Sequence, residues 1–167
     1  MTHASDLEKW YAKKCKMYYE LKRFQDCIDI GQEAFSTLSV FHYHYDKWIR
    51  RDMGRSYGEL GNPKEGIALF EKFMDDRSEY FIYYGWALFR EGKKKANAAE
   101  CKKGKEIIMK ALKERDTLAE GHFFLGMIEK MDGDINKAKG YLQKTLEHMP
   151  RHNEANSELR FINLKEQ

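Results

Sequence analysis

Residues 119–150 contain two amphipathic helical segments separated by a short turn, and this pattern restricts the possible folds more than any other part of the sequence. Gly133 can adopt the left-handed backbone conformation that ends a helix, and Asp134 can cap the helix that follows. Ala138 and Leu142 recur at helical spacing in the second segment, and Pro150 closes the unit. A hairpin of about 34 residues cannot bury its apolar faces alone, so we expect several such units to stack.

The spacing of these residues resembles the tetratricopeptide repeat (TPR). That repeat has a small residue midway through its first helix after a large apolar one, a glycine at the turn, an alanine early in its second helix and a closing proline. The residues at these places are Leu125, Gly126, Gly133, Ala138 and Pro150. The small residues let the two helix backbones approach closely. The resemblance implies an all-α fold, a right-handed α-solenoid of about four TPR helix hairpins plus a C-terminal capping helix.

Glycines recur at two matching positions in three successive units. They form the pairs Gly54 and Gly61, Gly85 and Gly92, and Gly126 and Gly133. Within each pair we interpret the first glycine as the small residue of the first helix and the second as the turn. The step from one pair to the next is 31 residues and then 41, whereas a regular repeat has about 34. We therefore expect an insertion in the third unit, near residues 93–103, before the second helix resumes.

The whole chain, residues 1–167, is expected to be one TPR domain. Its approximate parts are the repeats at 6–36, 41–77, 78–116 and 119–150, followed by the capping helix at 153–165. Cys15 and Cys27 stand at the two small-residue positions of the first repeat. Together with Cys101 they are odd in number and widely spaced, and they form neither a disulfide framework nor a zinc motif. We expect all three to be reduced and structural.

The composition is that of a folded, helix-rich protein, with 34% charged residues and two prolines among 167 residues. A net charge of +3 is too small to indicate nucleic acid or a membrane by itself. The longest apolar runs fall short of the roughly 20 residues that cross a bilayer, and the N-terminal segment lacks an apolar signal core. We therefore expect a cytoplasmic protein.

The motifs that usually accompany catalysis are missing from the sequence. It contains no nucleophile elbow, P-loop, dinucleotide-binding glycine run or HExxH motif, so we expect no enzyme activity and no cofactor. His42 and His44 are two residues apart and would face apart on a helix, while Pro150 lies between His148 and His152. We therefore expect no metal site.

In stacked hairpins of this type the first helices line a concave groove, and residues one step off the core stripe point into it. The residues expected there are Arg51, Arg55, Tyr83, Trp86, Phe89, Arg90, Phe123, Met127 and Lys130. Aromatic and methionine side chains with arginine at the edge are typical of peptide-binding surfaces. Guanidinium groups there could pair with acidic side chains or a C-terminal carboxylate. The alternative is that Trp86 and Phe123 pack between neighbouring repeats.

The resulting hypothesis is a non-enzymatic adaptor that binds a segment of another protein in this groove. Residues 79–165 also resemble, more loosely, the TPR modules of bacterial regulatory proteins, which suggests a regulatory, signalling or cell-polarity complex. Two alternatives stay open, a chaperone of the type III secretion class and a nucleic-acid binder. The second would use the basic face of residues 93–113. The slightly longer range 90–113 has nine basic and three acidic side chains but no aromatic one for stacking on bases. Self-association through Tyr43, Tyr45 or Trp48 is compatible with each of these.

Overall fold

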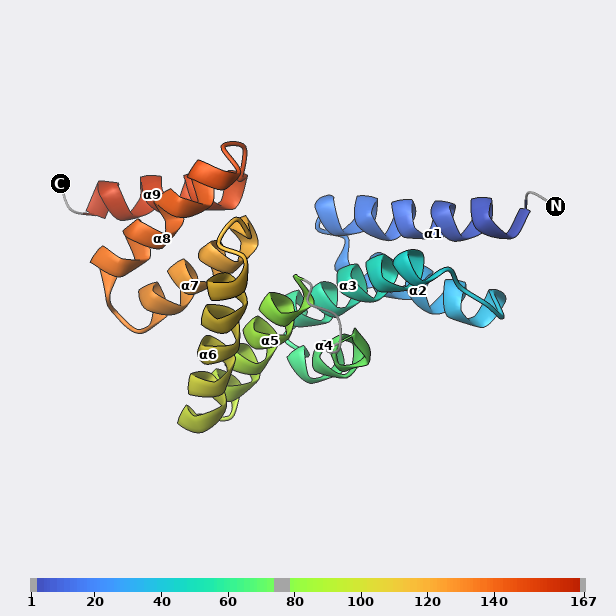
Figure 1. Cartoon of the computed structure of the whole chain (residues 1–167), viewed down its shortest axis with the longest axis horizontal. Coiled ribbons are helices and arrows are strands. Elements are labelled where there is room, and N and C mark those ends of the chain that lie inside the picture. The colour runs from blue at the N-terminus through green and yellow to red at the C-terminus, as the bar shows by residue number, and fades with distance from the viewer. Residues whose placement is uncertain (1–2, 74–78, 166–167) are drawn as a thin grey trace.

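The computed structural model describes residues 3–73 and 79–165, and the regular secondary structure in these ranges is helical (Figure 1). The elements are α1 (His3–Glu20), α2 (Phe24–Thr37), α3 (Tyr43–Glu59), α4 (Pro63–Phe70), the 3₁₀ helix η1 (Glu71–Phe73), α5 (Tyr80–Lys94), α6 (Ala98–Glu114), α7 (Ala119–Met131), α8 (Ile135–His148) and α9 (Asn153–Lys165). The expected boundary between residues 77 and 78 lies outside the described residues, as does the side chain of Tyr43.

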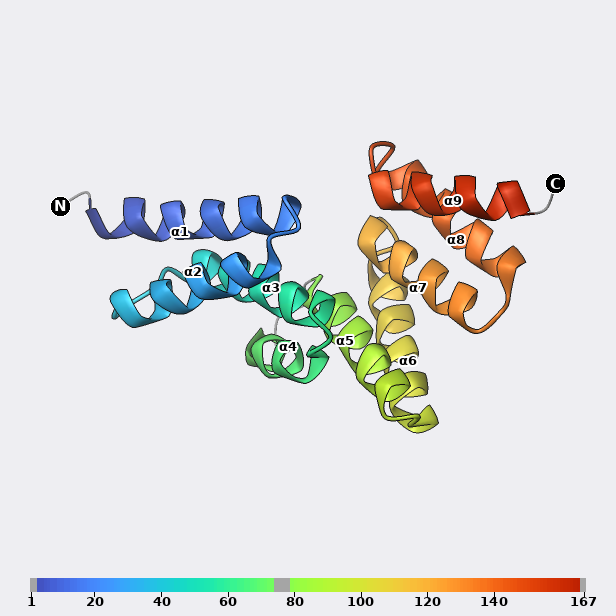
Figure 2. The ribbon, with the colours of Figure 1, turned by 180° about the vertical axis from the view of Figure 1, so that it is seen from behind.

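Consecutive helices in the described ranges pack as the hairpins α1/α2, α3/α4, α5/α6 and α7/α8. Each second helix also packs on the first helix of the next hairpin, and the first helices α1, α3, α5 and α7 contact one another in that order. The hairpins follow an arc with the two termini at opposite ends, as the views from the front and from behind both show (Figures 1 and 2). This arrangement confirms the all-α solenoid that the sequence predicts.

The four hairpins cross at pairs of small residues. These pairs are Cys15 with Cys27, Gly54 with Gly66, Gly85 with Gly104, and Gly126 with Ala138. In the first pair the Cys15 thiol lies 3.8 Å from the Cys27 carbonyl oxygen, and both side chains are buried. In the third pair, a Cβ added to Gly85 would lie 2.7 Å from the carbonyl oxygen of Gly104. The small-residue positions expected at Cys15, Cys27, Gly54, Gly85 and Gly126 are thus where helices cross.

The third hairpin is longer than the others, and the extra residues are helical. Its crossing residues, Gly85 and Gly104, are 19 positions apart, whereas those of the other hairpins are 12 apart. The seven additional residues correspond to about two helical turns. Because α5 continues to Lys94 and α6 already begins at Ala98, they lengthen both helices. The expectation that the second helix resumes only after residues 93–103 is therefore wrong.

Each hairpin turn contains one residue in the left-handed backbone region, two positions before the first residue of the next helix. These residues are Lys22 (φ 57°), Gly61 (φ 80°), Ala96 (φ 53°) and Gly133 (φ 89°). The turn expected at Gly92 is a misassignment, because Gly92 is buried within α5, where an added Cβ would lie 2.7 Å from the backbone nitrogen of Cys101. Asp134 caps α8 as predicted, since its carboxylate accepts a hydrogen bond from the Lys137 amide at 3.0 Å.

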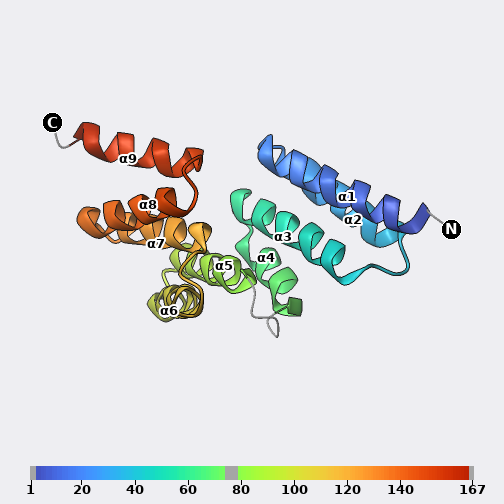
Figure 3. The same cartoon turned by 45° about the horizontal axis from the view of Figure 1, so that its top comes forward.

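The C-terminal helix α9 packs on α8, beyond the last hairpin (Figure 3). Its buried residues Ala155 and Ile162 pack with Leu142 of α8, while Phe161 and Leu164 stay exposed. α9 therefore covers the end of the stack with one apolar face, as expected of a capping helix. No helix in the described ranges is both long enough and apolar enough to cross a membrane.

Candidate interaction groove

A narrow hollow of about 20 Å³, enough for about one water molecule, lies where the first helices α1, α3, α5 and α7 meet. Because these helices belong to four successive hairpins, the hollow exists only in the assembled solenoid. Its aromatic and charged lining consists of Tyr19, Arg55, Glu59, Phe70, Tyr83, Trp86, Arg90 and Phe124. Of the nine residues predicted to line the groove, the hollow brings together Arg55, Tyr83, Trp86 and Arg90.

Arg55 of α3 is held at the centre of the hollow by aromatic and acidic neighbours. Its guanidinium carbon lies 4.1 Å from the ring centre of Tyr19 and 5.0 Å from that of Tyr83. Its Nη2 atom also lies 3.6 Å from a carboxylate oxygen of Glu120, on α7. A planar cation between two aromatic faces is well suited to this place, because the rings are attracted to its charge and cover its flat surface. Arg55 thus links the second hairpin to the fourth.

The other two predicted arginines are also paired with acidic side chains. Arg90 Nη1 lies 3.4 Å from Glu59, and its guanidinium carbon is 5.8 Å from the Trp86 ring centre. Arg51 donates hydrogen bonds of 2.8 and 3.1 Å to the carboxylate of Asp52, and it lies 3.6 Å from Glu79. The guanidinium groups expected to receive a ligand carboxylate therefore already have carboxylate partners within the protein.

The aromatic side chains of the groove form a stacked row. The Trp86 ring lies parallel to the rings of Phe124, at 5.1 Å, and Phe89, at 5.8 Å. Trp86 is half-buried, but Phe89 and Tyr83 are only 1% and 5% exposed. Phe89 therefore belongs to the core, which corrects the expectation that it lines the groove. Trp86 packs between repeats, against Phe124 of the fourth hairpin, and it also faces the hollow.

The predicted groove residues on α7 face the capping helix instead of the hollow. The Phe123 ring packs 4.6 Å from the ring of His152, directly before α9. Lys130 pairs with Glu158 of α9, and its ammonium group lies 5.2 Å from the Phe161 ring centre. Met127 is half-buried on the same helical face, between Phe123 and Lys130. α9 contacts this face of α7, so the open part of the groove ends at Phe124.

Burial sets the protonation of the groove's titratable groups. It raises the pKa of Tyr19 to about 12 and raises the pKa of Tyr83 as well, so both phenols stay neutral. Burial would also raise the pKa of the Glu120 carboxyl, but His152 and Arg55 outweigh it and lower that pKa. Glu120 is therefore an ionised partner for Arg55 at neutral pH.

Known proteins resemble this chain in structure but not in sequence. No protein-family model matches it, and no curated protein matches its sequence. TTC0263, a thermophilic TPR protein of Thermus thermophilus, superimposes with a TM-score of 0.75 at 16% identity, over 95% of this chain and 82% of that one. YrrB, a TPR protein whose structure is described as having an unusual peptide-binding site, gives a TM-score of 0.54 at 15% identity, over 90% of this chain and 73% of that one. MamA superimposes with a TM-score of 0.53 at 17% identity, over 93% of this chain and 80% of that one. The chain has the TPR fold.

Among the aromatic and charged residues that line the hollow, sequence reasoning missed Tyr19, Glu59, Phe70 and Phe124, and it also missed Glu120, which pairs with Arg55. Glu59 lies four residues after Arg55 on α3, so helical spacing alone could have placed it on the same face. Tyr19 and Glu120 carry no comparable signal, because they reach Arg55 only through the way α1 and α7 stack around α3 and α5. Their positions depend on how the whole TPR stack assembles.

The basic stretch of the third TPR hairpin is partly neutralised. Lys93 and Lys105 reach across to the fourth hairpin, where they lie 2.9 and 3.9 Å from the two carboxylate oxygens of Asp132. Lys105 also lies 2.8 Å from Glu129. Lys95 pairs with Glu91 at 3.0 Å within α5 and its turn. Much of this positive charge therefore stabilises contacts within and between hairpins.

Proposed function

We propose that this TPR protein is a non-enzymatic adaptor that binds a segment of a partner protein in the hollow between α1, α3, α5 and α7. The observation that carries the proposal is a stacked aromatic wall beside two arginines, Arg55 and Arg90, at the meeting point of four hairpins. Half-buried tryptophan and arginine next to each other are the side chains that most often dominate binding energy in protein interfaces. The peptide-binding site named for YrrB supports the same use of a TPR surface.

The internal ion pairs restrict which segment fits. Arg55 and Arg90 are already paired with Glu120 and Glu59. A ligand carboxylate must displace one of these glutamates, and the loss of that internal ion pair reduces its net binding free energy. At separations of 3.4–3.6 Å neither pair is a short hydrogen bond, so a ligand carboxylate can approach closer than the present partners do. We expect a segment that places an aromatic or aliphatic side chain against the Trp86 ring and an acidic residue beside it.

This function is proposed for a cytoplasmic setting, in a bacterial regulatory, signalling or cell-polarity complex, as the looser sequence resemblance suggests. A nucleic-acid role through residues 93–113 is less well supported, because Lys93, Lys95, Lys102 and Lys105 already lie against acidic side chains. A secretion chaperone would use the same hollow. Such a chaperone would differ in holding its partner in an unfolded state. The identity of the captured protein distinguishes the two functions.

Affinity capture from the native cell, followed by titration of the captured segment as a synthetic peptide, tests the proposal. Arg90→Ala is the chosen variant, because Arg90 is partly exposed and its pair with Glu59 adds little to stability. We expect the dissociation constant of the peptide to rise at least about tenfold. Lys103→Ala on α6 is the matched control, since it removes the same charge from an exposed position away from the hollow.

The control should bind the peptide as tightly as the unchanged protein does. If Arg90→Ala keeps its helical circular dichroism and binds the same partner with unchanged affinity, the hollow is not the binding site. Equal weakening by Arg90→Ala and Lys103→Ala would instead show a non-specific charge effect and would also contradict the proposal.

A further inference from the structure

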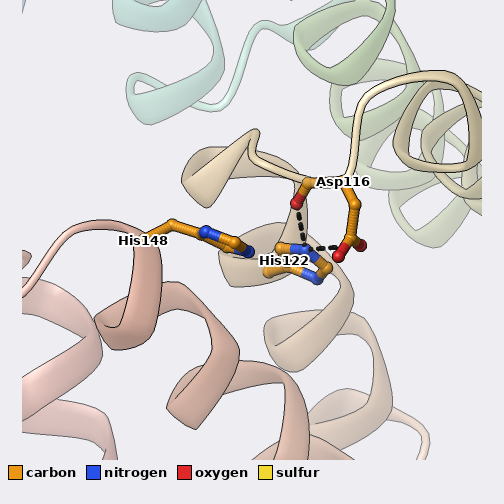
Figure 4. Close-up of side chains that lie close together, drawn as sticks. All are labelled: Asp116, His122 and His148. Carbon is orange, nitrogen blue, oxygen red and sulfur yellow. Dashed lines mark hydrogen bonds and ion pairs between the residues drawn. The ribbon is translucent and has the colours of Figure 1, made fainter.

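Three potential metal ligands from different elements meet near the first turn of α7. Asp116 lies in the link between α6 and α7, His122 in the first turn of α7, and His148 is the last residue of α8. Figure 4 shows the His122 ring between the other two side chains. One ligand atom of each residue lies within 4.8 Å of the others. The site is separate from the hollow between the first helices.

His122 is the buried member of this group, and its hydrogen bonding is incomplete. The residue is 1% exposed. Its Nε2 atom lies 2.7 Å from the carbonyl oxygen of Asp116 and 3.2 Å from its carboxylate. The other ring nitrogen, Nδ1, is buried without a hydrogen-bond partner among the described residues. For His122 to bind a cation through Nε2, its remaining ring proton must lie on Nδ1, which leaves Nε2 as the electron-pair donor.

The second buried histidine of this region is used differently. His152 Nδ1 accepts a hydrogen bond from the Ala155 amide at 3.2 Å, directly before α9. This contact satisfies one of the free amides at the start of that helix, so burial of His152 has a structural explanation. His122 makes no such contact to a helix end. Its Nε2 atom instead contacts Asp116 in the link before α7, and its ring stacks on that of His148.

His148 brings the second imidazole from an exposed helix end. Its ring lies 5.5 Å from the ring of His122, centre to centre, at an angle of 20°. Tetrahedral zinc holds its ligand atoms about 3.4 Å apart, given bonds of about 2.0–2.1 Å. Because the three ligand atoms already lie within 4.8 Å of one another, they must close by about 1.4 Å or less. Asp116 and His148 are both exposed, so side-chain rotation is sufficient.

We propose that Asp116, His122 and His148 bind one divalent transition-metal ion of the zinc class. Two imidazoles and one carboxylate form the nitrogen-rich ligand set that zinc, cobalt and nickel prefer, whereas magnesium and calcium favour oxygen ligands alone. With three protein ligands, at least one coordination position stays open. Because the two outer ligands are exposed, that position faces solvent and can take water or a carboxylate of a partner.

Binding at this site would fix the link between the third and fourth hairpins. Asp116 belongs to the segment between α6 and α7, while His122 and His148 belong to the fourth hairpin itself. A metal ion joining them restrains that link and therefore the angle between the two hairpins. Because protons compete with a metal ion for the imidazole nitrogens, we expect the affinity for the metal to fall as the pH is lowered.

The test uses the full chain without a polyhistidine tag, freed of metal by a chelator and titrated with zinc at about pH 7.5, because protonation of the ligands competes with metal binding at lower pH. We expect saturation at one zinc ion per chain. At a free zinc concentration about one hundred times the dissociation constant, the melting temperature should rise by about 5–10 °C. Cobalt should give the visible absorption of a tetrahedral site. Asp116→Asn and His148→Ala alter exposed ligands and leave the buried His122 in place, so both variants should fold.

We expect each variant to lose more than about tenfold in zinc affinity, together with the cobalt absorption and the rise in melting temperature. His44→Ala is the matched control, because His44 is also an exposed histidine and lies beside His42. It should bind zinc as the unchanged protein does. The proposal is overturned if zinc binding does not saturate, if it survives both ligand variants, or if it is lost in His44→Ala.

Discussion

The third and fourth hairpins both have small residues where their two helices cross, but the crossings differ in how much space they leave for an added Cβ. In the fourth, a Cβ added to Gly126 would meet the side chain of Leu142 at 3.1 Å and the carbonyl oxygen of Ala138 at 3.3 Å. In the third, a Cβ added to Gly104 would meet the backbone at 2.4 Å, at the carbonyl oxygen of Gly85, and at 2.7 Å, at the nitrogen of Phe89. A side chain can move by a few tenths of an ångström, whereas the backbone of a packed helix cannot. An added methyl group should therefore be tolerated at Gly126, in the crossing of the fourth hairpin, but not at Gly104, in the crossing of the third.

The largest expected effect comes from adding one methyl group at the third crossing. Gly104→Ala should lower the free energy of unfolding by about 2–3 kcal/mol, because the new atom forces two helix backbones apart. Gly126→Ala should cost about 1 kcal/mol or less, since Leu142 can shift and alanine favours the helix. Urea unfolding monitored by circular dichroism measures both values.

Gly140→Ala on α8 provides the control for this pair, because an added Cβ there meets nothing within 4 Å. It should raise the stability by up to about 1 kcal/mol through helix propensity alone. Equal losses for Gly104→Ala and Gly126→Ala would show that the distinction between backbone and side-chain contacts is wrong.

The second prediction concerns the ion pair that ties the fourth hairpin to the second. The folded protein holds the pKa of Glu120 below its ordinary value, so unfolding makes this carboxyl easier to protonate. The pair therefore contributes stability above the ordinary carboxyl pKa of about 4.3, and that contribution is lost as the pH falls through the folded value. Glu120→Gln should cost about 1 kcal/mol at about pH 7, and less at about pH 3.5.

Unfolding of the two proteins at these two pH values checks this prediction. Glu154→Gln serves as a control, because Glu154 also lies near His152, at 3.5 Å, but is largely exposed. It should change stability by less than Glu120→Gln at either pH. A loss for Glu120→Gln that is the same at both pH values would mean that the carboxylate charge is unimportant and that only its packing counts.

The same two hairpins show how far sequence reasoning reached. Gly85 and Gly126 were placed correctly because the repeat pattern encodes where two helices cross. Gly92 was taken for a turn because a glycine packed inside a helix and a glycine in a turn look alike in a sequence. The true turn residue, Ala96, has no local signal, since alanine is the best helix former. The sequence thus predicts the extra length of the third hairpin correctly, but it places the extra residues in an insertion between the helices and not in the helices themselves.

The groove likewise contains residues that the sequence could place and contacts that it could not. The sequence placed Arg55, Trp86 and Arg90 together because they belong to adjacent first helices with a shared helical face. It could not place Glu120 against Arg55, or α9 against Phe123 and Lys130, because these contacts depend on the curvature of the stack. The histidine cluster was missed for the same reason. His122 and His148 lie at opposite ends of a hairpin sequence and meet only when it folds back on itself.

The smallest expected effect compares the turns of the two hairpins. Gly133 and Ala96 both have left-handed backbones, with φ of 89° and 53°, but only glycine adopts that region without steric cost. Ala96→Gly should therefore raise the free energy of unfolding by about 0.5 kcal/mol, since relief of strain is partly offset by the greater flexibility of the unfolded chain. Gly133→Ala should lower it by about 1 kcal/mol. Opposite signs in urea unfolding would establish that the two turns have the same backbone requirement, which the sequence meets in the fourth hairpin and leaves strained in the third. Matching signs would mean that the extended helices of the third hairpin fix its turn independently of the residue at position 96.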